Sequence, residues 1–302
     1  MTMTATDRGA LLSMWIKPSS DDEQIQQDRA QRMVTDAVKA HDPLKTAKLY
    51  VYAKGSYANN TNVRRDSDVD IVMECQACIY DDYMPGQEPT TPVGTPYKGE
   101  WTPAKLRSEV TAALNNAFGS SDVDSSGKMA LVVAAVPSSR SSIDVIPSFD
   151  YFLYNDPQRR SSRRGSCVWP KTSLTKIVNW PDQQLTNGRA KNQRTGQRYK
   201  NYVRALKNAE NVLAKAGTIK AKPSYLMECL VWNVADATLK SGTLDGGFRA
   251  TLVELWQGLA DDGNYNYWTE PNDIKYLLRG GQKWSRSDAK EVVLETWRYL
   301  EY

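Results

Sequence analysis

Two acidic residues separated by one position stand at the start of an apolar segment of this sequence. Asp68 and Asp70 open the stretch "DVDIVMEC" (68–75), which is rich in residues that favour strands. Side chains at positions i and i+2 of a strand point the same way, so we expect the two carboxylates side by side. They repel unless a cation lies between them, and Mg²⁺ binds such carboxylates together with substrate phosphates. Taken alone, the pair fits a metal site and a solvated sheet edge equally well.

A third acid lies within another segment that predicts a strand. Asp144 stands between Ile143 and Val145 in "SSIDVIP" (141–147). An acid in an apolar strand needs a partner, because burying an unpaired charge is costly. If this strand lies beside 68–75, three carboxylates converge. Three acids can hold two metal ions about 3.5–4 Å apart, the geometry for in-line phosphoryl or nucleotidyl transfer.

A Gly-Ser pair precedes the acids and opens a polar, Asn-rich turn. Gly55 lets the backbone approach a phosphate closely, and Ser56 adds a hydroxyl and an amide at the start of the turn. The Asn-rich spacer that follows predicts only a polar connection between this pair and the acids.

The single histidine and the few cysteines exclude much other chemistry. His41 lies at the expected end of a helix, so we do not expect a Ser-His-Asp or Cys-His mechanism. The four cysteines are too few for a disulfide scaffold in a chain of 302 residues, which favours a cytoplasmic location. Cys75 and Cys78 could form half of a zinc site, but no second pair exists, and we expect them to be reduced and buried.

Composition and charge indicate a globular protein that binds a ligand containing phosphate. No run of about 18 apolar residues occurs, so we expect no membrane span, and we expect no secretory signal at the N-terminus. The net charge is only +4, but basic residues cluster in "QRRSSRRG" and in "GRAKNQRTGQRYKNYVRALK". Most of these residues can be ordinary solvated side chains. The clusters suit nucleotides at least as well as long nucleic acid, because aromatic residues do not interleave with them.

The expected elements change in character at about residue 156. Ser20 to Glu23 has capping-box spacing and predicts a helix over 21–40, and Thr102 with Pro103 predicts a helix that ends near Gly119. Strands are expected over 47–55, 68–75, 128–136, 141–147 and 149–154, with a long loop over 79–101. Helices are then expected over 181–192, 197–216, 223–240, 247–260, 271–279 and 287–301. We therefore expect two domains, 1–156 and 157–302, with a ligand at their seam.

The opening motif resembles a family signature. "GSYANNTNVRRDSDVDI" (55–71) with the later "IDVIP" (143–147) resembles the polymerase-β-like nucleotidyltransferases. It is more closely similar to the cGAS/DncV-like nucleotidyltransferases (CD-NTases) of bacterial CBASS anti-phage systems, as is "YVRALKNAE…KPSYLMECLVW" (202–232). The resemblance spans roughly residues 50–235. It implies an α+β fold in which a catalytic core, a mixed sheet flanked by helices, precedes a C-terminal helical lobe, with the active site at the seam.

The resemblance also implies roles for individual residues. Asp68 and Asp70 are expected to ligate two Mg²⁺ ions, with Mn²⁺ as an alternative metal, and Asp144 to complete the site and to be a candidate acceptor of the attacking hydroxyl's proton. Gly55 and Ser56 are expected to hold the triphosphate. From the helical lobe, Lys207 is expected to contact the triphosphate, with Ser224 beside it at a helix N-terminus, and Tyr225 to stack on a nucleobase. The plainer alternatives are a solvated lysine, a helix cap and a core tyrosine.

The function implied by the resemblance is the synthesis of a nucleotide second messenger. A ribose hydroxyl of one nucleoside triphosphate attacks the α-phosphate of another, and a second attack closes a cyclic di- or trinucleotide that activates a separate effector protein. ATP and at least one other triphosphate are the expected substrates, and no long nucleic acid is required. One alternative is nucleotidyl transfer to a small molecule or an RNA end. Another is a non-catalytic nucleotide- or RNA-binding protein, against which the three intact acids argue.

Overall fold

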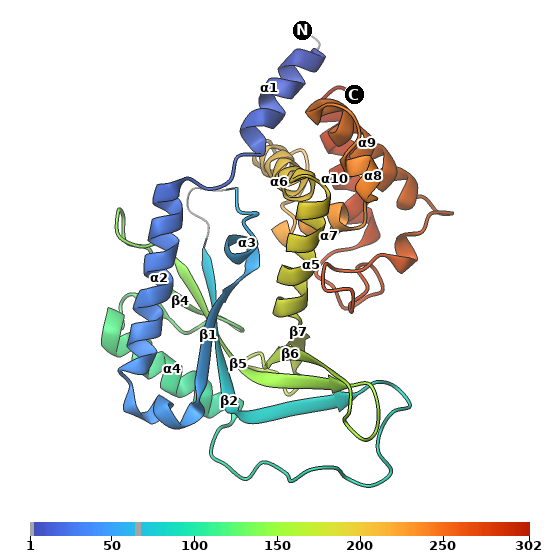
Figure 1. The fold of residues 1–302 in the computed structure, drawn as a ribbon. Coiled ribbons are helices and arrows are strands. Elements are labelled where there is room, and N and C mark those ends of the chain that lie inside the picture. The colour runs from blue at the N-terminus through green and yellow to red at the C-terminus, as the bar shows by residue number, and fades with distance from the viewer. Residues whose placement is uncertain (1–2, 64–67) are drawn as a thin grey trace. The chain divides into compact units, whose positions relative to one another are not determined.

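The chain forms two compact units. The structure is a computed structural model that describes residues 3–63 and 68–302 (Figure 1). One unit, called here the sheet unit, comprises Ser20–Tyr57 and Asp66–Pro181. The other, the helical unit, comprises Met1–Ser19, Ala58–Arg65 and Asp182–Tyr302. Part of the Asn-rich spacer, 64–67, lies outside the described residues.

The sheet unit is built on a mixed sheet. Its strands run in the order β1-β2-β5-β4-β3, and β6 pairs with β5 and β7 with β6. Strands β2 and β5 are parallel, and the other pairs are antiparallel. The strands are β1 (Leu49–Lys54), β2 (Val69–Tyr83), β3 (Val123–Asp124), β4 (Leu131–Val133), β5 (Ile143–Tyr154), β6 (Ser162–Val168) and β7 (Ile177–Asn179). The expected mixed sheet is therefore confirmed.

Two strands are longer than the sequence predicts. The segments expected as separate strands over 141–147 and 149–154 form the single strand β5, because Ser148 is buried and pairs in register with Glu74. Strand β2 continues to Tyr83, into the region expected as a loop, because its second half pairs with β5 after an irregularity between Cys75 and Ile79. In Figure 1 the two strands run side by side.

The helices of this unit begin where the sequence predicts. Helix α2 (Asp21–Lys39) has Ser20 as its N-cap with a complete capping box, and α4 (Pro103–Phe118) has Thr102 as its N-cap. The unit also contains the 3₁₀ helix η1 (Asp42–Ala47) and the short helix α3 (Gly55–Ala58). Helices α2 and α4 pack on each other and on the sheet. Their buried residues include Ala30, Val34, Leu106 and Val110.

The helical unit has most of the expected helices and lacks one. It contains α1 (Ala5–Trp15), α5 (Pro181–Arg194), α6 (Arg198–Lys215), α7 (Ser224–Trp232), α8 (Asp236–Leu239), α9 (Leu244–Gly258), η2 (Tyr265–Tyr267) and α10 (Arg286–Tyr299). The helix predicted over 271–279 is wrong. There Asn272 Oδ1 accepts hydrogen bonds from the amides of Ile274 and Lys275, both at 2.9 Å, and so favours a turn over a helix.

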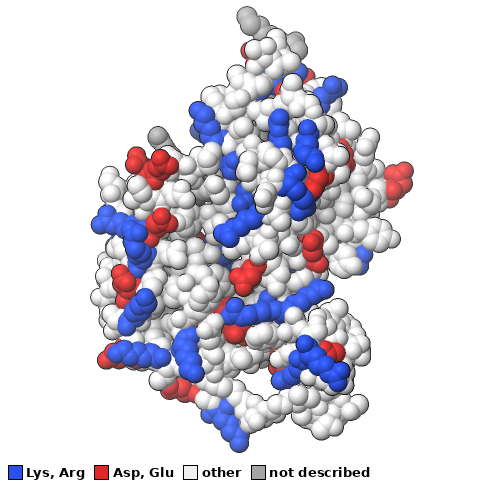
Figure 2. Space-filling model, viewed as in Figure 1, with Lys and Arg blue, Asp and Glu red and all other residues white. Residues whose placement is uncertain are grey.

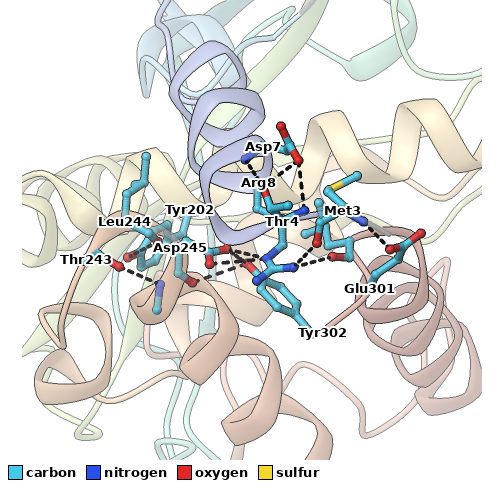
Figure 3. A network of polar contacts seen from close by, with 12 residues as sticks. Met3, Thr4, Asp7, Arg8, Tyr202, Thr243, Leu244, Asp245, Glu301 and Tyr302 are labelled. Carbon is cyan, nitrogen blue, oxygen red and sulfur yellow. Dashed lines mark hydrogen bonds and ion pairs between the residues drawn. The ribbon is translucent and has the colours of Figure 1, made fainter. Parts of the chain in front are cut away.

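Helix α1 joins the helical unit through a polar network (Figure 3). Arg8 Nε lies 3.1 Å from Asp245 Oδ1, and its guanidinium also donates to the carbonyl of Met3 at 2.9 Å. Tyr302 donates its hydroxyl to the same Asp245 oxygen at 2.6 Å. The units thus differ from the division expected at residue 156, because α1 belongs with the later helices and β6 and β7 extend the sheet.

The four cysteines and His41 have the surroundings that the sequence predicts. The four cysteines are free and buried. His41 lies at the start of η1, and its Nε2 is 2.9 Å from Glu109 Oε2, an ordinary structural contact. In the described part of the chain, none of the helices combines the length and the apolar character needed to cross a membrane.

Candidate active site

Strands β2 and β5 bring two of the predicted acids together. Asp70 and Asp144 are register partners across the parallel pair. Their neighbours Ile71 and Val145 are fully buried, so by strand alternation the two carboxylates lie on the opposite face of the sheet. Asp68 precedes β2 by one residue and is exposed. The adjacency of the two strands, on which the sequence argument depended, is therefore confirmed.

The three acids share one electrostatic environment. Burial, and after it the nearby charges of Asp70 and Asp68, together raise the pKa of Asp144 to about 6. Lys54 opposes this shift of the Asp144 pKa, and it is the register partner of Asp70 on the other side of β2. A site that disfavours its own negative charge in this way is one that a cation would stabilise.

The donors at this site suit a hard divalent metal ion. They are carboxylate oxygens from neighbouring strands, which are the ligands that Mg²⁺ and Mn²⁺ prefer. Within residues 3–63 and 68–302, no three His, Cys, Asp or Glu side chains are close enough together to form a metal site as they stand. Since like charges repel, a cation would be needed to draw the carboxylates to one point.

Gly55 lies directly against the Asp70 carboxylate. It follows β1 and has a φ of +71°, and a Cβ at this position would lie 2.1 Å from Asp70 Oδ2. Only glycine fits such a conformation at such an approach. Ser56 follows it in α3 and is half-buried. The structure therefore places the Gly-Ser turn next to the acids, as the motif requires.

Lys207 is buried and bound to the spacer. Its side chain lies on α6 and is 3% exposed, so the alternative of a solvated helix lysine is wrong. Its Nζ donates hydrogen bonds to the carbonyl of Thr61 at 3.0 Å and to Thr61 Oγ1 at 3.2 Å. A direct contact with a triphosphate stays a prediction.

Ser224 and Tyr225 open helix α7 but differ in exposure. Ser224 is exposed and is the first residue of the helix, whose N-cap is Pro223, so it is not the predicted cap. The ring of Tyr225 packs edge-on against Trp284, with centroids 6.1 Å apart, and its hydroxyl donates to Glu270 Oε2 at 3.3 Å. Burial raises the pKa of Tyr225 well above its usual value. Stacking of this ring on a nucleobase stays a prediction.

Known proteins of one family are similar to this chain in sequence. A family model described as the cGAS/DncV-like nucleotidyltransferase C-terminal helical domain matches residues 186–301. A cyclic dipyrimidine nucleotide synthase, CdnE, from Legionella pneumophila is 37% identical over 291 residues, which cover 95% of this chain and 96% of that protein. This chain belongs to the cGAS/DncV-like nucleotidyltransferases.

Solved structures of CD-NTases agree with both units of the chain. The Rhodothermus marinus CdnE c-UMP-AMP synthase with Apcpp and Upnpp has a TM-score of 0.83 and 26% identity, and the match covers 97% of each chain. The Elizabethkingia meningoseptica CdnE cyclic dinucleotide synthase with GTP and Apcpp has a TM-score of 0.79 and 28% identity, over 97% of this chain and 99% of the other. The expected fold of a catalytic sheet followed by a helical lobe is therefore confirmed.

The sequence argument missed two charged residues of this CD-NTase. Lys54 precedes Gly55 and faces Asp70 across the β1–β2 pair. Glu228 of α7 is 2% exposed and contacts the spacer through Asn59 and Thr61. The signal for Glu228 was present, because it is an acid within the apolar helix "SYLMECLVW". The same reasoning that singled out Asp144 applies to it.

Proposed function

We propose that this CD-NTase is a cyclic dinucleotide synthase that joins two nucleoside triphosphates and releases pyrophosphate. The observation that carries the proposal is the register pairing of Asp70 with Asp144, with the Gly55 backbone against the Asp70 carboxylate. Relatives named as cyclic dinucleotide synthases, matched over nearly the whole chain, support it. In this proposal the product activates a separate effector protein in anti-phage defence.

The acids of the sheet unit carry the chemistry in this proposal. Asp68, Asp70 and Asp144 would hold two Mg²⁺ ions, which supply charge stabilisation for the reacting phosphate and lower the pKa of the attacking hydroxyl. Asp144 would accept the hydroxyl's proton. Gly55 and Ser56 would receive the triphosphate with their backbone amides and the serine hydroxyl.

The helical unit would bind parts of the nucleotides that the acids do not contact. Ser224 is exposed at the N-terminus of α7, where backbone amides favour an anion. Tyr225 would stack on a base after its ring exchanges its contact with Trp284. Lys207 is buried and donates a hydrogen bond to Thr61, which supports a role in holding the spacer more directly than a contact with phosphate.

The relatives guide the choice of bases to test. The two with 37% and 30% identity, from Legionella pneumophila and Cecembia lonarensis, are both named cyclic dipyrimidine nucleotide synthases. Relatives with 29% and 28% identity are named for dipurine and UMP-AMP products. We therefore propose UTP and CTP as the first substrates, with ATP and GTP as the comparison.

The test is mass spectrometry of the products made from each pair of the four triphosphates with Mg²⁺. A phosphatase-resistant cyclic dinucleotide is expected, and Asp70→Asn should lower its rate by roughly 1,000-fold or more, since a metal ligand is lost. Asp22→Asn, the same change on the exposed first turn of α2, should leave the rate unchanged. Product formation only when a small molecule or RNA acceptor is added would instead support the alternative transfer reaction.

A further inference from the structure

The spacer between the Gly-Ser turn and the acid pair is polar, yet its middle is buried. Asn59, Thr61 and Asn62 are 2%, 0% and 4% exposed. Buried polar side chains cost free energy unless they find partners. Those partners are in the helical unit. The segment Ala58–Arg65 itself belongs to that unit, whereas the chain before and after the segment belongs to the sheet unit.

Glu228 holds the side chains of this spacer. It is 2% exposed on α7. Its Oε1 accepts hydrogen bonds from Asn59 Nδ2 at 3.2 Å and from Gln184 Nε2 at 3.1 Å, and its Oε2 accepts one from Thr61 Oγ1 at 3.3 Å. One buried carboxylate therefore fixes two spacer residues, with charge-assisted bonds that are stronger than neutral ones.

Two basic residues of α6 hold the backbone of the same spacer. Arg204 Nη1 donates to the carbonyl of Asn60 at 2.6 Å, and Lys207 Nζ donates to the carbonyl of Thr61 at 3.0 Å. Thr61 Oγ1 also accepts from Lys207 at 3.2 Å. Thr61 therefore lies between the ammonium of Lys207 and the carboxylate of Glu228, and its one hydroxyl connects the two charges.

We propose that Glu228 is a positioning residue for the transfer reaction, an inference that rests on the proposed function. By holding Asn59 and Thr61, it fixes the part of the spacer that begins three residues after Ser56. Loss of this hold leaves the Gly-Ser turn chemically intact but less well placed. A misplacement of about 1 Å can lower an enzymatic rate on the order of 100-fold, so turnover should suffer more than nucleotide affinity.

The central test is Glu228→Gln. Glutamine keeps the size of the side chain but replaces one acceptor oxygen with an NH₂ group that would meet the donors of Asn59, Gln184 or Thr61. We expect kcat to fall by about tenfold or more, while the Kd for a non-hydrolysable triphosphate analogue changes by less than about threefold. Thr61→Val, which removes only the hydroxyl, should behave alike, and Thr61→Ser should retain turnover.

A matched control separates positioning from general loss of stability. Glu210 of α6 is a buried carboxylate of the same unit, 3% exposed, that accepts from the Lys222 amide at 2.7 Å and so lies in another network. Glu210→Gln should leave kcat unchanged. Hydrogen exchange without nucleotide provides a readout apart from activity. Peptides covering 58–63 should exchange faster in Glu228→Gln and Thr61→Val but not in Glu210→Gln.

Two results would overturn the inference. One is wild-type kcat together with wild-type exchange over 58–63 in Glu228→Gln. The other is an equal fall in kcat in Glu210→Gln, which would assign the effect to the helical unit as a whole. A wild-type protein without any triphosphate turnover would instead contradict the proposed function, and the exchange comparison would still test whether Glu228 holds the spacer.

Discussion

At the scale of single residues, the charged form of Asp144 lowers the stability of the fold. Its pKa is about 6 in the fold and near 3.8 without the fold, because burial and two neighbouring carboxylates disfavour its charge. Between these two pH values the folded state binds more protons than the unfolded state. The free energy of unfolding therefore falls as pH rises from about 4 to about 6 and stays lower above that range.

We predict that Asp144→Asn stabilises the metal-free protein at pH 8 but not at pH 4. A shift of about two pKa units corresponds to about 3 kcal/mol at most, and solvent screening reduces the expected gain to about 1–2 kcal/mol. Urea unfolding in EDTA at the two pH values measures it, with Asp22→Asn as the control. Mg²⁺ should raise the Tm of the wild type more than that of the variant. An equal gain at both pH values would contradict the electrostatic cause.

Single residues were also what the sequence predicted best at this site. The acids and Gly55 follow from local chemistry, since strand alternation and a positive φ involve only near neighbours in the chain. The partners of Lys207 could not be predicted, because Thr61 is far from it in sequence. Lys207 is buried and binds the backbone of the spacer, while its contact with a triphosphate stays a prediction.

At the scale of elements, helix α1 shows how distant contacts decide membership of a unit. Arg8 is 14% exposed on its side chain and pairs with Asp245, and its guanidinium lies 4.9 Å from the centroid of the Tyr302 ring (Figure 3). These partners lie near the other end of the sequence. No local pattern in the first residues could therefore predict where α1 packs.

We predict that Arg8→Ala lowers the free energy of unfolding by about 2–4 kcal/mol, because it leaves the Asp245 carboxylate buried without its cation. Urea unfolding followed by tryptophan fluorescence measures the loss. Arg298→Ala is the matched control, because that side chain is 65% exposed and pairs with Glu295 in its own helix. The control should change stability by less than about 0.5 kcal/mol. Equal losses in both variants would show that the buried pair of Arg8 and Asp245 contributes no more to the free energy of unfolding than an exposed pair.

Other elements show where local patterns succeed and fail. Helices α2 and α4 were predicted from their caps, which are local hydrogen bonds. Strand β6, "SRRGSCV", was missed because its polar residues do not favour strands. It forms because Arg164 lies between Glu74 and Asp150, with Nη2 at 2.6 Å and Nε at 2.8 Å from their carboxylates. That pairing depends on β2 and β5 being in place.

At the scale of the whole molecule, several residues of the two basic clusters are paired with acids. Arg159 pairs with Asp81, Arg164 with Glu74 and Asp150, and Lys191 and Arg194 with Asp236. On the face in view in Figure 2, Lys and Arg are spread out with Asp and Glu between them. Binding of long nucleic acid needs many basic residues that can neutralise successive phosphates. These pairings leave fewer of them available than the sequence suggests.

We therefore predict that triphosphate turnover does not require long nucleic acid. Adding duplex DNA or single-stranded RNA should change the initial rate by less than about twofold, and their weak binding should fall steeply with salt. Product formation at low and moderate salt, with and without each nucleic acid, measures this. Arg160→Glu and Arg163→Glu, at exposed positions of the first basic cluster, are the informative variants. A stimulation of tenfold or more that these variants or salt remove would contradict the prediction. It would mean that the exposed residues Arg160 and Arg163 belong to a regulatory surface.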